Sequence, residues 1–351
     1  MMQWANRRQF LTGVGAAAAG AVGASAAAPL ERIDCQSHVF LPELVELMEK
    51  RKASPYLYRK DGGAYIVVND WTRRLMPKHM DVDAKLADMD ASGIQMAALS
   101  INDPGPELFG GDGPAIGRLV NDGIAEIAKQ HPKRFFGLMV LPLQDIDASL
   151  EEMERCANKL GMKGILLYSN INGAFPDEER FRPVFAQAER MKLPVLLHPA
   201  YPITYEVTKG REMATMLGLM FDTTIALGRI ILAGMLDEFP RLKLVCPHVG
   251  GALPFLVGRM DHQTMVLKRG AGHIRKAPSE YLKQVWFDAV SPIGLAVKYG
   301  IDFAGPEKML FSTDHPWVEP KIILDVIESL HLAPDAEAKV MGGNARALFH
   351  L

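Results

Sequence analysis

The chain has little cysteine and no long basic run. Its 351 residues include three cysteines, Cys35, Cys156 and Cys246, and none stands in a CxxC pair. An odd number of thiols without such spacing provides neither a full disulfide framework nor a zinc–thiolate motif, so we interpret them as small buried side chains. The 39 Lys and Arg residues nearly balance the 41 acidic ones. This composition gives no indication of a nucleic-acid or anionic-membrane partner.

The N-terminus lacks the strongly hydrophobic run of a transmembrane helix. Arg7 and Arg8 precede Phe10 and Leu11, and the uncharged stretch "VGAAAAGAVGASAAAP" follows. A cationic start, a mildly apolar middle and small residues near a cleavage point are typical of a secretory signal, and the paired arginines indicate the twin-arginine type. We predict a signal peptide over residues 1–28, export to the periplasm, and no stable membrane insertion once the signal is removed.

The rest of the chain lacks the glycine-rich phosphate loop that a doubly wound sheet would carry after its first strand. Instead, eight short apolar runs alternate with amphipathic helical patterns. The runs are "RIDCQS", "MAALS", "FFGLMVL", "GILLY", "PVLLH", "KLVCPH", "VWFDA" and "MLFSTD". Such runs are typical of parallel strands buried on both faces, so we predict a single (β/α)₈ barrel over residues 29–351, with the open sheet as the alternative.

Two connections are longer than this barrel requires. They cover about residues 40–80, after the first run, and about residues 200–225, after the fifth. Both follow the carboxyl ends of predicted strands, where barrels of this class carry their active sites. We therefore expect both insertions to shape a substrate pocket.

Polar residues end four of the eight runs. Gln36 and His38 end the first, His198 the fifth, His248 the sixth and Asp314 the eighth. One strand-end histidine alone is more often structural, but four such positions meet at one mouth of a barrel. Two histidines and one carboxylate also form a catalytic divalent-metal site with an open position.

The stretches that carry a family resemblance are "IDCQSH", "VLLHP", "MLDEFPRLKLVCPHVGGALPFLVGRM", "WFDAV" and "LFSTDHPW". In this order they resemble the amidohydrolase-related family that includes the α-amino-β-carboxymuconate-ε-semialdehyde and γ-resorcylate decarboxylases. The resemblance implies a metal-dependent barrel in which His38, His198 and Asp314 hold the ion. It implies that His248 acts on the substrate rather than holding metal. From its chemistry, we expect Asp314 to combine weak metal binding with proton transfer. The resemblance also implies that Arg259 binds a substrate carboxylate in a neighbouring subunit, and hence a homodimer.

Gln36 departs from the family pattern, which has His or Glu at this place. A neutral amide oxygen is a weaker ligand than either, so we expect Gln36 to be a weak or outer-shell metal contact. Zn²⁺ is the expected ion and Mn²⁺ the alternative. A further arginine would be needed to bind a carboxylate substrate, and Arg73 and Arg74 in the first insertion are the candidates.

Three functions stay open at this point. The first, which we expect, is non-oxidative decarboxylation of a small aromatic or cyclic carboxylic acid, with His248 or Asp314 protonating the carbon that loses carbon dioxide. The second is metal-dependent hydrolysis of a lactone, an amide or an activated carbon–carbon bond. The third is a metal-free binding protein on the same barrel, for which Gln36 is the direct support.

Overall fold

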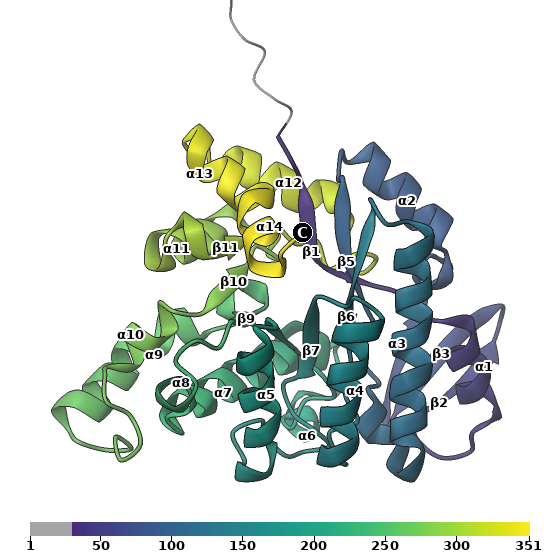
Figure 1. Ribbon diagram of the computed structural model, residues 1–351, viewed down its shortest axis with the longest axis horizontal. Coiled ribbons are helices and arrows are strands. Elements are labelled where there is room, and N and C mark those ends of the chain that lie inside the picture. Colours follow the sequence, from purple (N-terminus) through teal and green to yellow (C-terminus); the bar gives the residue numbers. More distant parts are fainter. Residues whose placement is uncertain (1–29) are drawn as a thin grey trace, which may run out of the picture.

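The structure is a computed structural model that describes residues 30–351, so the predicted signal peptide over residues 1–28 lies outside the described residues. Eight parallel strands form its centre and pair in the order β1-β5-β6-β7-β8-β9-β10-β11 (Figure 1). Their bounds are Ile33–His38 (β1), Met96–Ser100 (β5), Phe135–Met139 (β6), Gly164–Tyr168 (β7), Val195–His198 (β8), Leu244–Cys246 (β9), Trp286–Asp288 (β10) and Met309–Leu310 (β11). Each predicted apolar run overlaps one of these strands, and the predicted single barrel is confirmed.

The barrel closes because the segment that follows β11 runs beside β1. The backbone N–H of Asp314 donates to the carbonyl of Gln36 at 2.9 Å, and the N–H of His38 donates to the carbonyl of His315 at 2.8 Å. A parallel bridge joins Ser37 to His315 at the same seam. These bonds hold the end of the first strand in register with residues almost 280 positions further along the chain.

Helices cover the outside of the barrel. In α3, Ile116, Val120 and Ile124 recur every four residues, and this buried stripe faces β6 as expected for an amphipathic helix. The helices are α1 (Pro42–Lys50), α2 (Val82–Ala91), α3 (Gly113–Gln130), α4 (Ile146–Lys159), α5 (Arg182–Met191), α6 (Tyr205–Thr208), α7 (Leu219–Leu232), α8 (Met235–Glu238), α9 (Leu253–Asp261), α10 (Pro278–Leu282), α11 (Gly294–Ala304), α12 (Pro320–Ser329), α13 (Pro334–Ala338) and α14 (Asn344–Phe349).

The first long connection folds into a three-stranded antiparallel sheet after α1. Its strands are β2 (Tyr56–Lys60), β3 (Gly63–Val68) and β4 (Trp71–Leu75). Asp61 and Gly62 form the turn between β2 and β3 with φ of 49° and 72°. Positive φ at both positions suits an Asp-Gly turn between antiparallel strands.

The second long connection contains α6 and leads into the helix Ala214–Leu232, which includes α7. Within residues 30–351 this is the helix whose length and composition would allow it to cross a membrane, and half of it is buried in the protein. It packs against α9 and α10. These contacts are those of a core helix.

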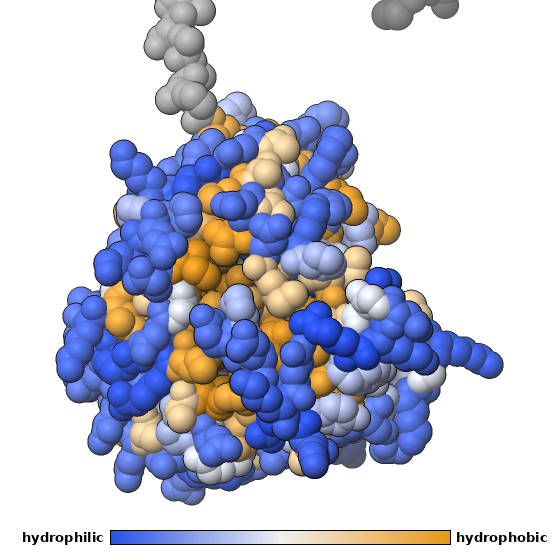
Figure 2. Space-filling view, turned by 90° about the vertical axis from the view of Figure 1, so that its right-hand side faces the viewer, coloured by the Kyte–Doolittle hydropathy of each residue, from blue (hydrophilic) through white to orange (hydrophobic). Residues whose placement is uncertain are grey.

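Buried hydrophobic side chains form one large cluster that joins the barrel, its helices and the small sheet. A second, smaller cluster consists of Trp71, Tyr205 and Ala214, so the two long connections contact each other. Figure 2 shows the face on the right-hand side of Figure 1, where hydrophilic side chains surround a central band of hydrophobic ones.

Candidate active site

Three side chains from the first, fifth and eighth barrel strands converge at the carboxyl end of the barrel. His38 ends β1, His198 ends β8, and Asp314 follows β11. His38 Nε2 lies 3.0 Å from Asp314 Oδ1 and 3.2 Å from His198 Nε2. Their potential ligand atoms all lie within 4.8 Å of one another. The three side chains singled out in the sequence as metal ligands therefore surround a common point.

Hydrogen bonds on the far side of each ring orient the two histidines. His38 Nδ1 lies 3.0 Å from Ser100 Oγ, which in turn donates to the carbonyl of Ser37 at 3.3 Å. His198 Nδ1 donates to the carbonyl of Pro199 at 2.7 Å. With Nδ1 protonated in both rings, each Nε2 presents a lone pair to the common point, as metal-binding histidines do.

The donor set fits one divalent ion. Three acceptor atoms face one another here, an arrangement that a cation between them would stabilise. Bonds of about 2.0–2.1 Å to a tetrahedral Zn²⁺ place ligand atoms about 3.3 Å apart, which is close to the separations of 3.0 and 3.2 Å around His38.

The protonation states also suit metal binding. Burial acts to raise the pKa of the Asp314 carboxyl, but its contacts with His248 and His38 outweigh burial and hold that pKa well below its usual range. Burial, and then the nearby His38, lowers the pKa of His198 well below its ordinary value of 6.5. Asp314 is thus ionised and His198 neutral, the forms in which each can coordinate an ion.

Gln36 contacts the site through its amide nitrogen. Its Nε2 donates a hydrogen bond to Asp314 Oδ1 at 3.1 Å, while its backbone N–H donates to Asp34 Oδ1. A carboxylate only accepts hydrogen bonds, so the amide nitrogen is the end that faces Asp314. In this orientation Gln36 holds one of the candidate ligands and directs its own oxygen elsewhere.

His248 lies across from Asp314 on an unusual backbone. It follows β9 with φ of 55°, and Val249 has φ of 56°, a region that costs non-glycine residues about 1–3 kcal/mol. Asp288, at the end of β10, accepts hydrogen bonds from the backbone N–H of His248 at 2.7 Å and of Val290 at 3.1 Å. Asp288 therefore acts on the shape of this loop, a role the sequence did not indicate.

The environment of His248 favours its charged form. Burial acts to lower the pKa of this imidazole, but Asp314 and Asp288 outweigh burial and raise the pKa above its ordinary value. His248 Nε2 lies 3.9 Å from Asp314 Oδ2, which is within ion-pair distance. A cationic imidazole in this place can donate a proton to a bound molecule.

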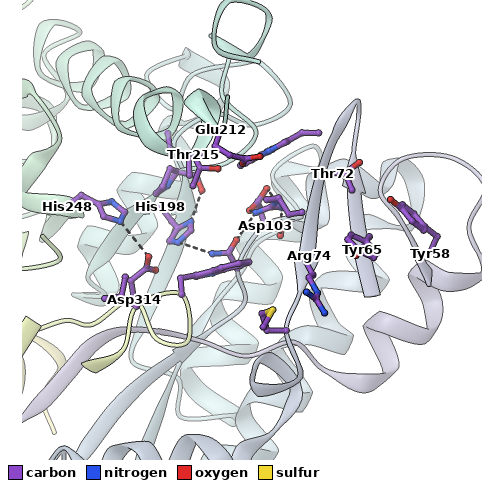
Figure 3. A pocket seen from close by; sticks show the side chains of 18 residues that line it. Tyr58, Tyr65, Thr72, Arg74, Asp103, His198, Glu212, Thr215, His248 and Asp314 are labelled. Atoms are coloured by element: carbon purple, nitrogen blue, oxygen red, sulfur yellow. Dashed lines mark hydrogen bonds and ion pairs between the residues drawn. The ribbon is translucent and has the colours of Figure 1, made fainter. Parts of the chain in front are cut away.

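A cavity of about 740 Å³ opens from these residues toward the two long connections. Figure 3 shows His198, His248 and Asp314 on one side and Tyr58, Tyr65 and Arg74 on the strands across from them. The lining residues are Tyr58, Tyr65, Trp71, Thr72, Arg73, Arg74, Met76, Asn102, Asp103, His198, Pro199, Glu212, Thr215, Leu219, His248, Asp314, Trp317 and Val318. The volume is within the usual range for a small-molecule site.

Arg73 and Arg74 both line this cavity but differ in their partners. The Arg73 guanidinium pairs with Asp103 through two nitrogens at 2.5 and 2.8 Å and stacks over Trp71 at 4.4 Å. Arg74 has no hydrogen bond or ion pair within residues 30–351. Arg74 is therefore the arginine of the pair that is available to an anionic ligand.

Arg259 lies outside this cavity. It is exposed near the end of α9 and does not line the site of its own chain. Arg259 therefore does not contact a ligand in the cavity of its own chain.

Several contributors are absent from the sequence interpretation. Lys85 is buried on α2 and reaches across the β1–β11 seam, with Nζ 2.6 Å from Ser37 Oγ and 2.7 Å from His315 Nδ1. His315 thus points away from Asp314. Asn102, which follows β5, lies between Arg73 and His198. Nothing in the local sequence of these residues distinguishes them from ordinary surface or loop positions.

Comparison with known proteins places this geometry in context. The amidohydrolase family profile matches residues 33–351. A 2-amino-3-carboxymuconate-6-semialdehyde decarboxylase from Dictyostelium discoideum is 28% identical over 76% of this chain and 75% of its own length. A gamma-resorcylate decarboxylase from Rhizobium sp. (strain MTP-10005) is 29% identical over 87% of this chain and 97% of its own length.

Solved structures share the whole barrel. The 5-carboxyvanillate decarboxylase LigW from Sphingomonas paucimobilis superposes with a TM-score of 0.81 at 26% identity, covering 92% of this chain and 99% of that one. A dihydroxybenzoic acid decarboxylase from Polaromonas sp. JS666, solved with bound manganese, gives a TM-score of 0.77 at 24% identity and covers 92% of this chain and 97% of its own.

Proposed function

We propose, on the premise that this chain belongs to the amidohydrolase family, that it is a metal-dependent decarboxylase of a small aromatic or cyclic carboxylic acid. One observation carries the proposal. His38, His198 and Asp314 surround a point that suits one divalent ion, beside a protonatable His248 and within a cavity of about 740 Å³. The named relatives add support, since they are decarboxylases of aromatic or muconate acids.

The ion, when bound, would polarise a substrate oxygen and draw electrons away from the bond to the carboxyl group. We propose Zn²⁺ or Mn²⁺ for this place. The imidazole nitrogens favour Zn²⁺, while the manganese bound in the Polaromonas structure supports Mn²⁺. Elemental analysis of purified protein would distinguish them.

The chain's own residues would position the acid and supply the proton. Arg74 faces the cavity without an ion-pair partner in the described part of the chain and would attract an anionic substrate into it. Trp71 and Trp317 would contact a planar ring. The imidazolium of His248 would give its proton to the carbon that loses its carboxyl group, while the carbon–carbon bond breaks and carbon dioxide leaves.

The direct experiment measures carbon dioxide release from a panel of hydroxybenzoic acids and related cyclic acids. We expect release from at least one acid, with loss of release after chelation and recovery when the ion is restored. His248→Ala should abolish release without changing metal content. No release from any acid, together with turnover of lactones or amides, would replace the proposal by the hydrolase alternative. Protein that holds neither metal nor turnover would instead favour a binding role.

We also propose a homodimer in which Arg259 contributes to the partner's site. On α9, Phe255 is 82% exposed and Leu256 37%, and a partner subunit that binds beside Arg259 would cover this adjacent apolar pair. Light scattering on the purified protein tests the oligomeric state. Mixing inactive Arg259→Ala with inactive His248→Ala protein tests the shared site. If each subunit lends its arginine to the other, a mixed dimer has one intact site of two, so an equimolar mixture that exchanges subunits freely would regain about a quarter of the wild-type activity.

Export by the twin-arginine route is a further proposal, which depends on the sequence alone. Arg7 and Arg8 stand ahead of the uncharged Ala/Gly stretch. Cell fractionation should find the protein in the periplasm, and Arg7→Lys/Arg8→Lys should retain it in the cytoplasm. An unchanged distribution of the double variant would refute this route.

A further inference from the structure

The opposite end of the barrel carries a second cavity with a different electrostatic character. Its volume is about 410 Å³, and it lies where β9, β10 and β11 begin, whereas the candidate active site lies where the barrel strands end. Four cationic side chains line it, and no carboxylate does: Arg241, Lys243, Lys283 and Lys308. The active-site cavity, in contrast, includes carboxylates among its lining residues.

Three of these cations lack a charged partner. Lys243 Nζ contacts the carbonyl of Leu348 at 3.3 Å and His350 Nε2 at 3.2 Å, and Lys308 Nζ donates to the carbonyl of Gln284 at 3.2 Å. Neither lysine, nor Lys283, has a carboxylate within 4 Å anywhere in residues 30–351.

Arg241 differs from the lysines because it pairs with Glu189 at 3.4 Å. The ammonium groups of Lys243 and Lys308 are also partly removed from water. Burial lowers the pKa of both, and the nearby Lys192 lowers that of Lys243 further, while Glu307 partly opposes the shift at Lys308. A bound anion would favour the charged form of both ammonium groups and offset part of the cost of removing them from water.

Apolar surface accompanies the charge. Phe239 and Trp286 line the cavity, and Lys308 Nζ lies 4.5 Å from the centre of the Trp286 ring. A cavity with aromatic walls and a few converging cations suits a ligand that has a planar body and one anionic group. A lysine ammonium group acts as a point charge and donates hydrogen bonds, so it can bind either a carboxylate or a phosphate.

We propose that this cavity is a second binding site, for a small aromatic anion, at the amino-terminal end of the barrel. Lys243 and Lys308 bind the anionic group, and Trp286 with Phe239 contacts the ring. The site does not depend on the reaction at the other end of the barrel. Its proposed occupant is defined by chemistry alone, a planar aromatic ring that bears one carboxylate or phosphate.

Calorimetric titration of the metal-loaded enzyme with 2-naphthoate tests the proposal. The wild type should show a binding event that Lys243→Met/Lys308→Met weakens about tenfold or more, in line with the loss of charge-assisted hydrogen bonds. Lys133→Met/Lys159→Met removes the same charge at exposed lysines outside the cavity and should leave that event unchanged. Binding to the active-site cavity is common to all three proteins, so the difference between them reports the second site.

Further ligands and variants separate the possible results. 1-Naphthyl phosphate replaces the carboxylate by phosphate, and 2-naphthalenemethanol removes the charge and should not bind this site. Inorganic phosphate should bind more weakly than either naphthyl anion, because it has no ring to contact Trp286. In Trp286→Leu the naphthyl anions should bind no more tightly than inorganic phosphate. Lys308→Arg keeps the charge and should retain binding, and thermal melting of each variant establishes that it is folded. Equal 2-naphthoate binding by the wild type and the Lys243→Met/Lys308→Met protein would overturn the proposal.

Discussion

Gln36 donates its side-chain N–H to Asp314 Oδ1 at 3.1 Å, although the two residues stand 278 positions apart. This hydrogen bond contacts the carboxylate oxygen that also faces His38 Nε2, and it restricts the orientation of a candidate metal ligand. Contacts of this kind typically change metal affinity by about 10–100-fold when they are removed. Gln36, at the position where the family pattern has His or Glu, thus contacts the candidate metal site by a hydrogen bond to Asp314.

Gln36→Met should weaken metal retention, because it removes the hydrogen bond to Asp314 and keeps the side-chain volume. Gln36→His should strengthen retention, because an imidazole replaces a neutral amide beside the ion. The measurement is residual metal after dialysis against increasing chelator, and Gln130→Met, at an exposed position, serves as the control. Identical loss curves for all four proteins would show that Gln36 has no part in metal binding.

His248→Asn should lower kcat by about 10²–10⁴-fold, because the proton donor is lost. Metal content should not change, since His248 is not among the three converging ligands. The exposed His262 provides a control through His262→Asn. A fully active His248→Asn protein would transfer the proton to another group, with Asp314 as the remaining candidate.

Two neighbouring arginines should respond in opposite ways. Arg73→Met leaves the carboxylate of Asp103, whose side chain is 3% exposed, without its partner, so unfolding free energy should fall by about 3–5 kcal/mol. Arg74→Met should change stability by no more than about 0.5 kcal/mol, because Arg74 is exposed and unpaired in the described chain.

Steady-state kinetics tests whether Arg74 binds the substrate. Arg74→Met should raise KM for a carboxylic acid substrate by about 10–100-fold, as expected for the loss of hydrogen bonds to a charged group. An unchanged KM in Arg74→Met would remove Arg74 from substrate binding, and an unaltered denaturation midpoint in Arg73→Met would contradict the structural role of Arg73.

Glu107 should make stability depend on pH. Its side chain is buried after β5, Oε2 has no hydrogen-bond partner within residues 30–351, and burial, with a further contribution from Asp103, raises its pKa from 4.5 to about 8. The folded protein therefore binds this proton more tightly than the unfolded chain does. The resulting stability is present below about pH 4.5 and is lost as pH rises toward about 8.

Glu107→Gln keeps an uncharged side chain at every pH. Its melting temperature should exceed that of the wild type by at least about 3 °C at pH 8 and should match it at about pH 4. Glu151→Gln, at an exposed position of α4, should show no such difference. Parallel melting curves for Glu107→Gln and the wild type across this range would disprove the assignment.

The barrel can be predicted from the sequence because each of its buried strands is a short apolar run. Runs such as "GILLY" and "VLLH" are apolar on both faces, and the second ends in His198, which lines the active-site cavity. The order of these runs then dictates which side chains meet, since parallel strands place their carboxyl ends at one edge. For this reason the convergence of His38, His198 and Asp314 could be anticipated without coordinates.

The small sheet of the first insertion also left a signal, which the sequence interpretation did not use. Asp61-Gly62 separates two segments rich in β-branched and aromatic residues, a typical hairpin pattern. The unequal roles of Arg73 and Arg74 were not accessible in this way. They depend on Asp103, which reaches Arg73 from a different part of the chain.

The backbone conformations at the mouth were beyond sequence reasoning as well. Asp314 and His248 both have positive φ, at 61° and 55°. Bonds from distant strands hold them there, with Gln36 accepting the N–H of Asp314 and Asp288 accepting the N–H of His248. No local pattern predicts a conformation that tertiary contacts impose.

The closure of the barrel between β1 and the segment after β11 has a consequence for biosynthesis. Of the candidate ligands, His38 is synthesised first and Asp314 last, 276 positions further along the chain. A nascent chain that has completed only the barrel strands from β1 to β10 has no place where the three side chains can meet. The three candidate ligands can therefore meet only after the segment beyond β11 has left the ribosome, and premature termination before β11 would yield a polypeptide that lacks Asp314.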